Sequence, residues 1–320
     1  MKTTTKTIEI KDTSILPQLF GPHNAHVTHL EQALGITIQD RGNTLTLTGA
    51  VKALKQAEKA LKDLQKKIKK GQDVGTAEID ASLRFMNSTP APSPQTDSTS
   101  MSSQTIKTKK KTIAPRSPNQ GTYIQMIRDH ELVFGLGPAG TGKTYLAVAM
   151  AVSMFLEGKV ERLIFTRPAV EAGEKLGFLP GDMKDKVDPY LRPIYDALHD
   201  MIPTDIVAKK IESGEIEIAP LAFMRGRTLS RAFVILDEAQ NTTPVQMKML
   251  LTRLGESSRM VITGDLSQTD LPGHIKSGLR DAVEMLEHVE GIGFMRFERQ
   301  DVIRHPLVSK IVKAYDGRKD

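Results

Sequence analysis

A glycine-rich turn at residues 137–144 constrains the fold of this chain more than any other feature of its sequence. Residues 132–150 read LVFGLGPAGTGKTYLAVAM: an apolar run, the turn GPAGTGKT, and a second apolar run with helical spacing. The turn satisfies G-x-x-x-x-G-K-[ST] between a predicted strand and a predicted helix, which is the context that a phosphate-binding loop requires. Its glycines let backbone N–H groups surround phosphates, and the positive end of the helix dipole adds to the attraction.

The turn therefore predicts a site for a nucleoside triphosphate with Mg²⁺. Lys143 is expected to reach the β and γ phosphates, and the Thr144 hydroxyl is expected to ligate the metal. The alternative interpretation is a plain glycine-rich turn, which the flanking strand and helix disfavour. The predicted nucleotide-binding residues are Gly137, Pro138, Ala139, Gly140, Thr141, Gly142, Lys143, Thr144 and Tyr145.

Two adjacent acids follow another apolar run, FVILDEAQN at residues 233–241. The four apolar residues predict a buried strand. Its end would present Asp237 to the metal and Glu238 to the water that attacks the γ phosphate. Adjacent acids after a strand can also serve only to cap the first N–H groups of a helix. The phosphate loop earlier in the chain favours the metal and water roles over that alternative.

Short apolar runs alternate with helical patterns over residues 115–320. The runs are ELVFGL, RLIFT, EIEIAPL, FVILDE, RMVITGD and GFMRF, and helical patterns such as PVQMKMLLTRL and GLRDAVEMLEHV lie between them. Strands that alternate with helices predict a parallel sheet with helices on both faces, with ligands at the carboxyl ends of the strands. We therefore predict an α/β fold of the P-loop NTPase type for residues 115–320.

Composition divides the chain before residue 115 into two parts. Residues 88–105 read STPAPSPQTDSTSMSSQT, in which only Ala91 and Met101 are counted as apolar, and the basic run IKTKKK follows. So few apolar residues cannot bury enough surface to offset the conformational entropy that ordering would cost. We therefore predict a disordered linker over residues 76–114. Residues 1–75 contain strand-like and helical segments in the order β-α-β-β-α, which predicts a small α+β domain.

The basic charge of the chain lies outside the part that contains the phosphate loop. The net charge is +6; residues 1–75 contain 12 Lys and Arg against 7 Asp and Glu, whereas residues 121–320 contain 26 against 28. A polyanion is therefore expected to meet the N-terminal part first. A lysine row repeats there at intervals of three or four residues, beside an apolar stripe of the same predicted helix: Lys52, Lys55, Lys59, Lys62 and Lys66. Such a row is also typical of an ordinary solvated helix face.

Composition also excludes some classes of protein. The chain has no cysteine, so it holds neither a disulfide framework nor a thiolate metal site. No apolar run approaches the roughly 20 residues of a membrane span, and the N-terminus MKTTTKTIEI lacks the apolar core of a signal peptide. We expect a cytoplasmic protein that does not enter a membrane.

Over residues 115–320 the chain resembles the PhoH-like ATPase family, whose members are similar to superfamily 1 helicase cores. The resemblance rests on SPNQGTYIQMI, GPAGTGKT, FTRPAVEAGEKLGFLPGD, PLAFMRGRTL, ILDEAQN, ITGDLSQTDLP and RQDVIRHPLV, in that order. It implies one helicase-like ATPase core that uses ATP and Mg²⁺ and assembles as a homo-oligomeric ring. Residues 1–75 are similar to the small KH-like module at the front of this family, which implies RNA binding. The candidate for the GXXG loop of a KH module, GPHN, keeps only the first glycine, Gly21.

The resemblance also implies roles for residues beyond the phosphate loop. Gln120 stands where such ATPases read adenine, and an ordinary polar role at a helix start is the alternative. Asp265 and Gln268 occupy a sensing motif whose glutamine contacts the γ phosphate and water, unless the motif is only a turn at a strand end. Arg304 is the candidate arginine finger, in the same subunit or a neighbour, with Arg299 as a rival. The motif at residues 166–181, which begins with Thr166 and Arg167, would lie on the nucleic-acid path or at a subunit contact.

The sequence thus predicts Mg²⁺-dependent ATP hydrolysis coupled to RNA binding or remodelling, in ribosomal RNA maturation. A partner endoribonuclease or a ribosomal subunit is the expected further partner. The alternative is a nucleotide-switched oligomeric scaffold that recruits a partner enzyme and touches RNA only incidentally. A small-molecule kinase is the third interpretation. Stimulation of ATP turnover by RNA would separate the first two.

Overall fold

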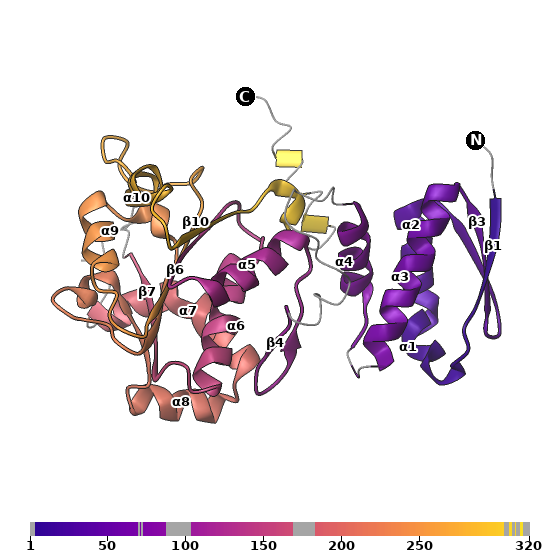
Figure 1. Ribbon diagram of the computed structural model, residues 1–320, viewed down its shortest axis with the longest axis horizontal. Helices are drawn as coiled ribbons and strands as arrows, with labels where there is room; N and C mark the ends of the chain where they lie inside the picture. The colour runs from indigo at the N-terminus through magenta and orange to yellow at the C-terminus, as the bar shows by residue number, and fades with distance from the viewer. Residues whose placement is uncertain are drawn as a thin grey trace. The chain divides into compact units, whose positions relative to one another are not determined.

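The computed structural model describes residues 4–69, 71, 73–87, 104–168, 183–303, 307–308, 311 and 314–315. The chain divides into two compact units (Figure 1). The smaller is Met1–Ser98 with Pro115–Pro118, and the larger is Thr99–Ala114 with Asn119–Asp320. Among the described residues, none of the helices has both the length and the apolar character needed to cross a membrane.

The smaller unit is an antiparallel three-stranded sheet with four α-helices. Strand β3 (Thr44–Gly49) lies between β1 (Thr4–Glu9) and β2 (Thr37–Arg41). The helices are α1 (Leu16–Phe20), α2 (Ala25–Leu34), α3 (Val51–Lys69) and α4 (Thr76–Asn87), with short 3₁₀ turns η1 (Thr13–Ile15) and η2 (Pro22–Asn24). The alternation TLTLTG buries Leu45 and Leu47 on one face of β3, against the apolar stripe of α3. The predicted α+β character is present, while the likeness to a KH module stays a prediction.

The range predicted as a linker, residues 76–114, is corrected at both ends. Helix α4 is part of the smaller unit: Ile79 is fully buried in its core, and Ser82 Oγ donates to Asp63 Oδ2 of α3 at 2.6 Å. Near the other end, β4 (Ile106–Lys107) and β5 (Thr112–Ile113) form a hairpin of the larger unit. The composition argument concerned residues 88–105, of which 88–103 lie outside the described residues. Disorder over residues 88–103 stays a prediction.

The larger unit has the predicted α/β architecture. Its main sheet has six described strands, all paired in parallel in the order β11-β6-β10-β9-β7-β8. They are β6 (Leu132–Leu136), β7 (Arg162–Arg167), β8 (Ile216–Pro220), β9 (Ala232–Leu236), β10 (Arg259–Gly264) and β11 (Ile292–Arg296). The helices are α5 (Pro118–Asp129), α6 (Lys143–Leu156), α7 (Met183–Met201), α8 (Thr204–Glu212), α9 (Pro244–Leu251) and α10 (Gly278–Leu286), with 3₁₀ turns η5 (Leu221–Met224), η6 (Ala239–Asn241) and η7 (Arg299–Asp301).

Helices cover both faces of this sheet, so its strands are buried on both sides (Figure 1). On one face, α5, α6 and α7 pack against alternate strand residues such as Phe165 and Ile235. On the other face, α9 and α10 pack against the intervening residues, such as Ile164 and Leu236. Continuous apolar runs in the sequence follow from this double burial. The central strands β6, β9 and β10 end at one edge of the sheet, where the predicted site residues follow them.

Candidate nucleotide site

The phosphate loop connects β6 to α6 and contains three glycines with positive φ. The φ angles are 140° at Gly137, 84° at Gly140 and 85° at Gly142, a region that side chains with a Cβ rarely adopt. A Cβ at Gly137 would also lie 2.5 Å from the backbone oxygen of Phe297. The loop therefore needs glycine both for its backbone conformation and for its close packing on the residue that follows β11.

Lys143 lies inside this loop. Its Nζ donates to the backbone oxygens of Gly137 at 2.6 Å and Pro138 at 2.9 Å, and only 9% of the residue is exposed. Burial lowers the pKa of Lys143, and the nearby carboxylates of Asp265, Asp237 and Glu238 oppose this shift without cancelling it. A buried ammonium held by two neutral oxygens is suited to a stronger anionic partner such as a phosphate.

Asp237 and Thr144 meet at the amino end of α6. The Thr144 Oγ1 hydroxyl donates to Asp237 Oδ1 at 2.6 Å, and Thr263 Oγ1 of β10 donates to the same oxygen at 2.7 Å. Asp237 is 6% exposed. Mg²⁺ prefers few protein oxygens together with phosphates and water. The pair fits such an ion, and no group of three or more His, Cys, Asp or Glu suited to a metal occurs among the described residues.

Glu238 stands next to Asp237 in the chain but in different surroundings. Its φ is 54°, in the left-handed region, and 39% of its side chain is exposed. Arg167 Nη2, at the end of the neighbouring strand β7, lies 3.7 Å from Glu238 Oε1. The Gln240 amide donates to the other oxygen, Oε2. One carboxylate oxygen therefore accepts a hydrogen bond from an amide, and the other forms an ion pair with a guanidinium.

Gln240 is a site residue that the sequence did not reveal. It is 4% exposed, and besides donating to Glu238 it accepts a hydrogen bond from the backbone N of Asp265 at 3.1 Å. Asp265 Oδ2 in turn accepts from Gln268 Nε2 at 2.8 Å, and its Oδ1 accepts from Ser267. One amide thus connects the acid after β9 to the predicted sensing residues after β10. The letters DEAQ contain the residue, but only the folded turn η6 brings its amide back to Glu238.

Gln120, the predicted adenine-reading residue, lies at the phosphate loop. It is 4% exposed on the first turn of α5, and its Nε2 donates to the Thr141 backbone oxygen at 2.9 Å. A Cβ at Gly142 would lie 3.0 Å from the same nitrogen. The structure thus places Gln120 against the loop, while adenine recognition by this residue stays a prediction.

Two other predicted features are only partly described. Arg304 lies outside the described residues, although the backbone N of Ile303 donates to the Gly140 oxygen at 2.8 Å. The rival Arg299 is exposed in η7. Thr166 and Arg167 end β7, but residues 169–181 of the motif at 166–181 lie outside the described residues.

The site residues line two adjoining cavities. One, of about 250 Å³, is lined by the phosphate loop with Asp237, Glu238, Asp265 and Gln268. The other, of about 670 Å³, is lined in part by Arg167, Pro193, Asp196 and Asp200. Thr144, Tyr145, Asp237 and Glu238 line both. The structure therefore gathers the loop, both acids and Gln268 around one space at the carboxyl ends of β6, β9 and β10.

Comparisons with known proteins agree on a family. A family model described as "PhoH-like protein" matches residues 112–316. The PhoH-like protein of Bacillus subtilis is 47% identical over 298 residues, covering 93% of each chain. The PhoH-like protein of Synechocystis is 43% identical over 316 residues, covering 99% of this chain and 96% of its own. Among solved structures, the Hef helicase domain of Pyrococcus furiosus is similar with a TM-score of 0.35 and 13% identity, over 61% of this chain and 43% of that one.

Proposed function

This chain belongs to the PhoH-like protein family, and from that premise we propose that it is a Mg²⁺-dependent ATPase whose hydrolysis is coupled to RNA binding or remodelling. One observation carries the ATPase part: the hydroxyl of Thr144 in the loop is hydrogen-bonded to Asp237, which follows β9. The two residues predicted to hold Mg²⁺ are 93 positions apart in the sequence and meet beside the loop that contains Lys143.

Each residue of the site has a distinct task in this proposal. Lys143 binds the β and γ phosphates, while Asp237 and Thr144 hold Mg²⁺, which supplies positive charge to the phosphates when bound. Glu238 orients the attacking water and accepts its proton, and the Gln268 amide contacts the γ phosphate. Gln240 fixes the Glu238 side chain relative to the segment that contains Gln268, because it hydrogen-bonds both to Glu238 and to the backbone N of Asp265.

The RNA part of the proposal is supported by the lysine row of α3. Lys52, Lys55, Lys59, Lys62 and Lys66 are all exposed. Lys62 forms an ion pair with Glu58 at 3.0 Å. A row of exposed lysines on one helix suits the phosphates of a nucleic acid, which release counterions when they are neutralised. We propose ribosomal RNA as the substrate, an endoribonuclease or a ribosomal subunit as partner, a homo-oligomeric ring as the assembly, and the cytoplasm as the location.

Exposed apolar side chains favour a second candidate function, the nucleotide-switched scaffold. Val245 of α9 is 79% exposed and Met285 of α10 is 72% exposed, and the two helices pack against each other. Such side chains suit a contact with another protein or another copy of the chain. In this alternative the ATP site controls assembly, and RNA has no effect on hydrolysis.

ATP turnover with and without RNA tests the proposal. We expect a basal rate that needs Mg²⁺, is lost in Lys143→Ala, and rises on addition of single-stranded RNA. The stimulation should weaken in a Lys55→Gln, Lys59→Gln variant and persist in a Lys209→Gln, Lys248→Gln variant, whose exposed lysines lie in the larger unit. RNA affinity should also fall with salt, and the slope should become shallower by roughly 0.7 for each phosphate of the single strand that a variant no longer neutralises.

The outcomes separate the candidates. Turnover that is Mg²⁺-dependent but unchanged by RNA would favour the scaffold. No Mg²⁺-dependent turnover in the wild type, at any RNA concentration, would overturn the ATPase assignment. If the two double lysine variants lost RNA stimulation of ATP turnover to the same extent, a specific role for α3 in RNA binding would be contradicted.

A further inference from the structure

The hairpin β4–β5 is part of a strap, residues 104–113, that crosses helices of the larger unit. Ile106 is fully buried and Ile113 is 8% exposed, both in the core that contains α5, α6 and α7. Arg128 Nη2 of α5 donates to the Thr105 oxygen at 2.9 Å, and the turn is closed by Thr108 N donating to the Lys111 oxygen at 2.9 Å. The strap is therefore fixed to the larger unit by both packing and hydrogen bonds.

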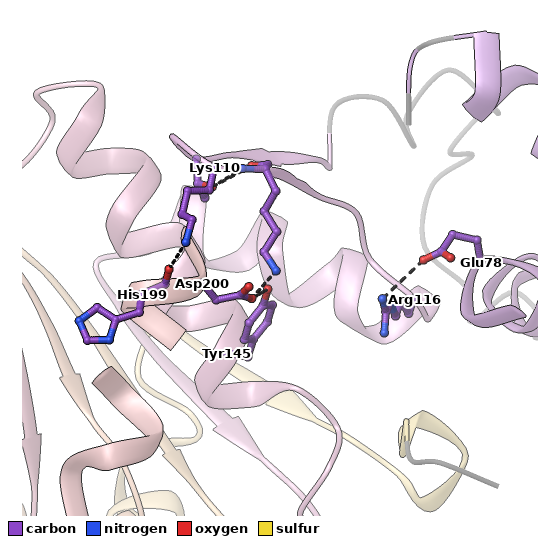
Figure 2. Close-up of polar contacts among 8 residues, drawn as sticks. Glu78, Lys110, Arg116, Tyr145, His199 and Asp200 are labelled. Carbon is purple, nitrogen blue, oxygen red and sulfur yellow. Dashed lines mark hydrogen bonds and ion pairs between the residues drawn. The ribbon is translucent and has the colours of Figure 1, made fainter. Parts of the chain in front are cut away.

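The turn of the strap binds the carboxyl end of α7 (Figure 2). The backbone N of Lys110 donates to the Met201 oxygen at 3.1 Å, and Lys110 Nζ donates to the His199 oxygen at 2.7 Å. Carbonyl groups in the last turn of a helix have no partner within the helix, and the helix dipole favours a cation there. Lys110 supplies both a backbone donor and a charge at that end.

Lys111 and Tyr145 meet on one carboxylate of α7. Lys111 Nζ forms an ion pair with Asp200 Oδ2. The Tyr145 hydroxyl donates to the same oxygen at 2.7 Å, as Figure 2 shows for Tyr145 and Asp200. Lys111 Nζ also lies 5.7 Å from the centre of the Tyr145 ring. Burial alone would raise the pKa of Asp200, but the hydrogen bonds from Lys111 and Tyr145 outweigh it and hold the pKa below its usual value. Asp200 is thus an ionised acceptor between the strap and α6.

Tyr145 is the residue through which these contacts reach the nucleotide site. It follows Thr144 directly, lies in the first turn of α6, and lines both cavities. Its hydroxyl is tied to Asp200, so the ring cannot turn freely in the cavity that it lines. The rotamer of Tyr145 is therefore set by an acid of α7 and a lysine of the strap.

We propose that the strap is a positioning element of the nucleotide site, in which Lys111 acts through Asp200 to fix Tyr145 and thereby sets nucleotide affinity. The inference rests on the proposed ATP binding and goes beyond it, because it assigns a binding role to a segment outside the motifs of the ATPase core. Lys111 and Asp200 are positioning residues, and they act through Tyr145, which lines the cavities of the site.

The test is the affinity of the full-length protein for Mg·ADP, measured by titration calorimetry. The side chains of Lys111 and Asp200 are 38% and 43% exposed, and such pairs contribute little to folding stability. Lys111→Met should thus leave the unfolding temperature nearly unchanged while it weakens Mg·ADP binding about three- to fivefold. Tyr145→Phe and Asp200→Asn should have similar effects. Lys109→Met, the same substitution at an exposed lysine two residues away, should bind like the wild type.

Two further measurements make the proposal specific. Lys111→Arg should restore binding, because a guanidinium can still pair with Asp200. A double variant, Lys111→Met with Tyr145→Phe, should bind no more weakly than either single variant, since both changes break one linkage. Wild-type affinity in Lys111→Met, or additive losses in the double variant, would overturn the strap proposal. A wild-type protein that does not bind Mg·ADP would instead overturn the proposed function itself.

Discussion

Asp237 and Glu238 are adjacent acids with opposite surroundings. Asp237 is 6% exposed and accepts from two hydroxyls, whereas 39% of the Glu238 side chain is exposed and faces an arginine and an amide. The first environment suits a fixed metal ligand. The second leaves a carboxylate beside open space, where a water could be oriented. Two neighbouring residues of one type can therefore do different chemistry.

We expect Glu238→Gln to keep nucleotide binding and to lose turnover. A positioned base contributes about 10²- to 10⁴-fold in rate, so kcat should fall by that factor while Mg·ADP affinity stays near that of the wild type. Lys143→Ala should weaken both binding and turnover, because in the proposed function its ammonium contacts the phosphates in both states. Steady-state kinetics and calorimetry on the two variants provide the comparison. A Glu238→Gln protein that hydrolyses ATP normally would refute the assignment.

Gln240→Met should lower kcat with little change in Mg·ADP affinity. Methionine has nearly the same size but neither the N–H donor for Glu238 nor the acceptor for Asp265 N. Glu238 and the segment that contains Gln268 would then lose the hydrogen bonds that hold them in place. We therefore expect kcat to fall about tenfold. Gln125→Met, at an exposed position of α5, is the matched control. Equal kinetics in the two variants would show that Gln240 only fills space.

The site residues that could be predicted are those that lie in continuous motifs. GPAGTGKT and the two acids of DEAQ specify their own local geometry, so their positions at the strand ends could be inferred from spacing. The contact of Arg167 with Glu238 and that of Tyr145 with Asp200 join positions 71 and 55 residues apart. Such contacts depend on which strands and helices become neighbours, and one sequence without relatives gives no signal for them.

At the scale of elements, the sequence predicted long regular segments better than short ones. The six strands of the parallel sheet were visible as apolar runs because both of their faces are buried. Helix α4 was not predicted, although Ile79 and Leu83 have helical spacing. The disordered linker inferred from the polar residues 88–105 was extended back to residue 76, so it included this helix. The hairpin β4–β5 has two residues in each strand, too few for an alternating pattern.

The strap makes a prediction about truncated proteins. A chain that begins at residue 104 keeps Ile106 and Ile113 in the core, whereas one that begins at the predicted boundary, residue 115, lacks them. Loss of a buried isoleucine typically costs about 2–5 kcal/mol. We therefore expect the chain from residue 115 to unfold at least roughly 5 °C below the chain from residue 104, by calorimetry. Equal unfolding temperatures would mean that the strap adds nothing to the fold.

At the scale of the whole molecule, the proposed ring assembly raises the question of which subunit would supply the proposed arginine finger. The backbone N of Ile303 donates to the Gly140 oxygen of the same chain, so the residue before Arg304 is tied to its own phosphate loop. We expect Arg304 to act in its own subunit. Arg304→Ala should lower turnover, and mixing it with Lys143→Ala subunits should restore none of the lost activity. Recovery in mixtures that are shown to co-assemble would instead assign the finger to a neighbouring site.

The backbone angle at Glu238 has a consequence for folding. A residue with a Cβ costs about 1–2 kcal/mol at a φ of 54°, and glycine avoids that cost but loses about 0.5–1 kcal/mol through its freer unfolded chain. Glu238→Gly should therefore be up to about 1 kcal/mol more stable than Glu238→Ala, which keeps the strained angle and, like glycine, lacks the side chain that accepts from Gln240. Denaturant unfolding of the two variants measures the difference, and a less stable Glu238→Gly would contradict it. The backbone conformation at residue 238 thus lowers the stability of the wild-type protein, and only a variant without the Glu238 carboxylate avoids that cost.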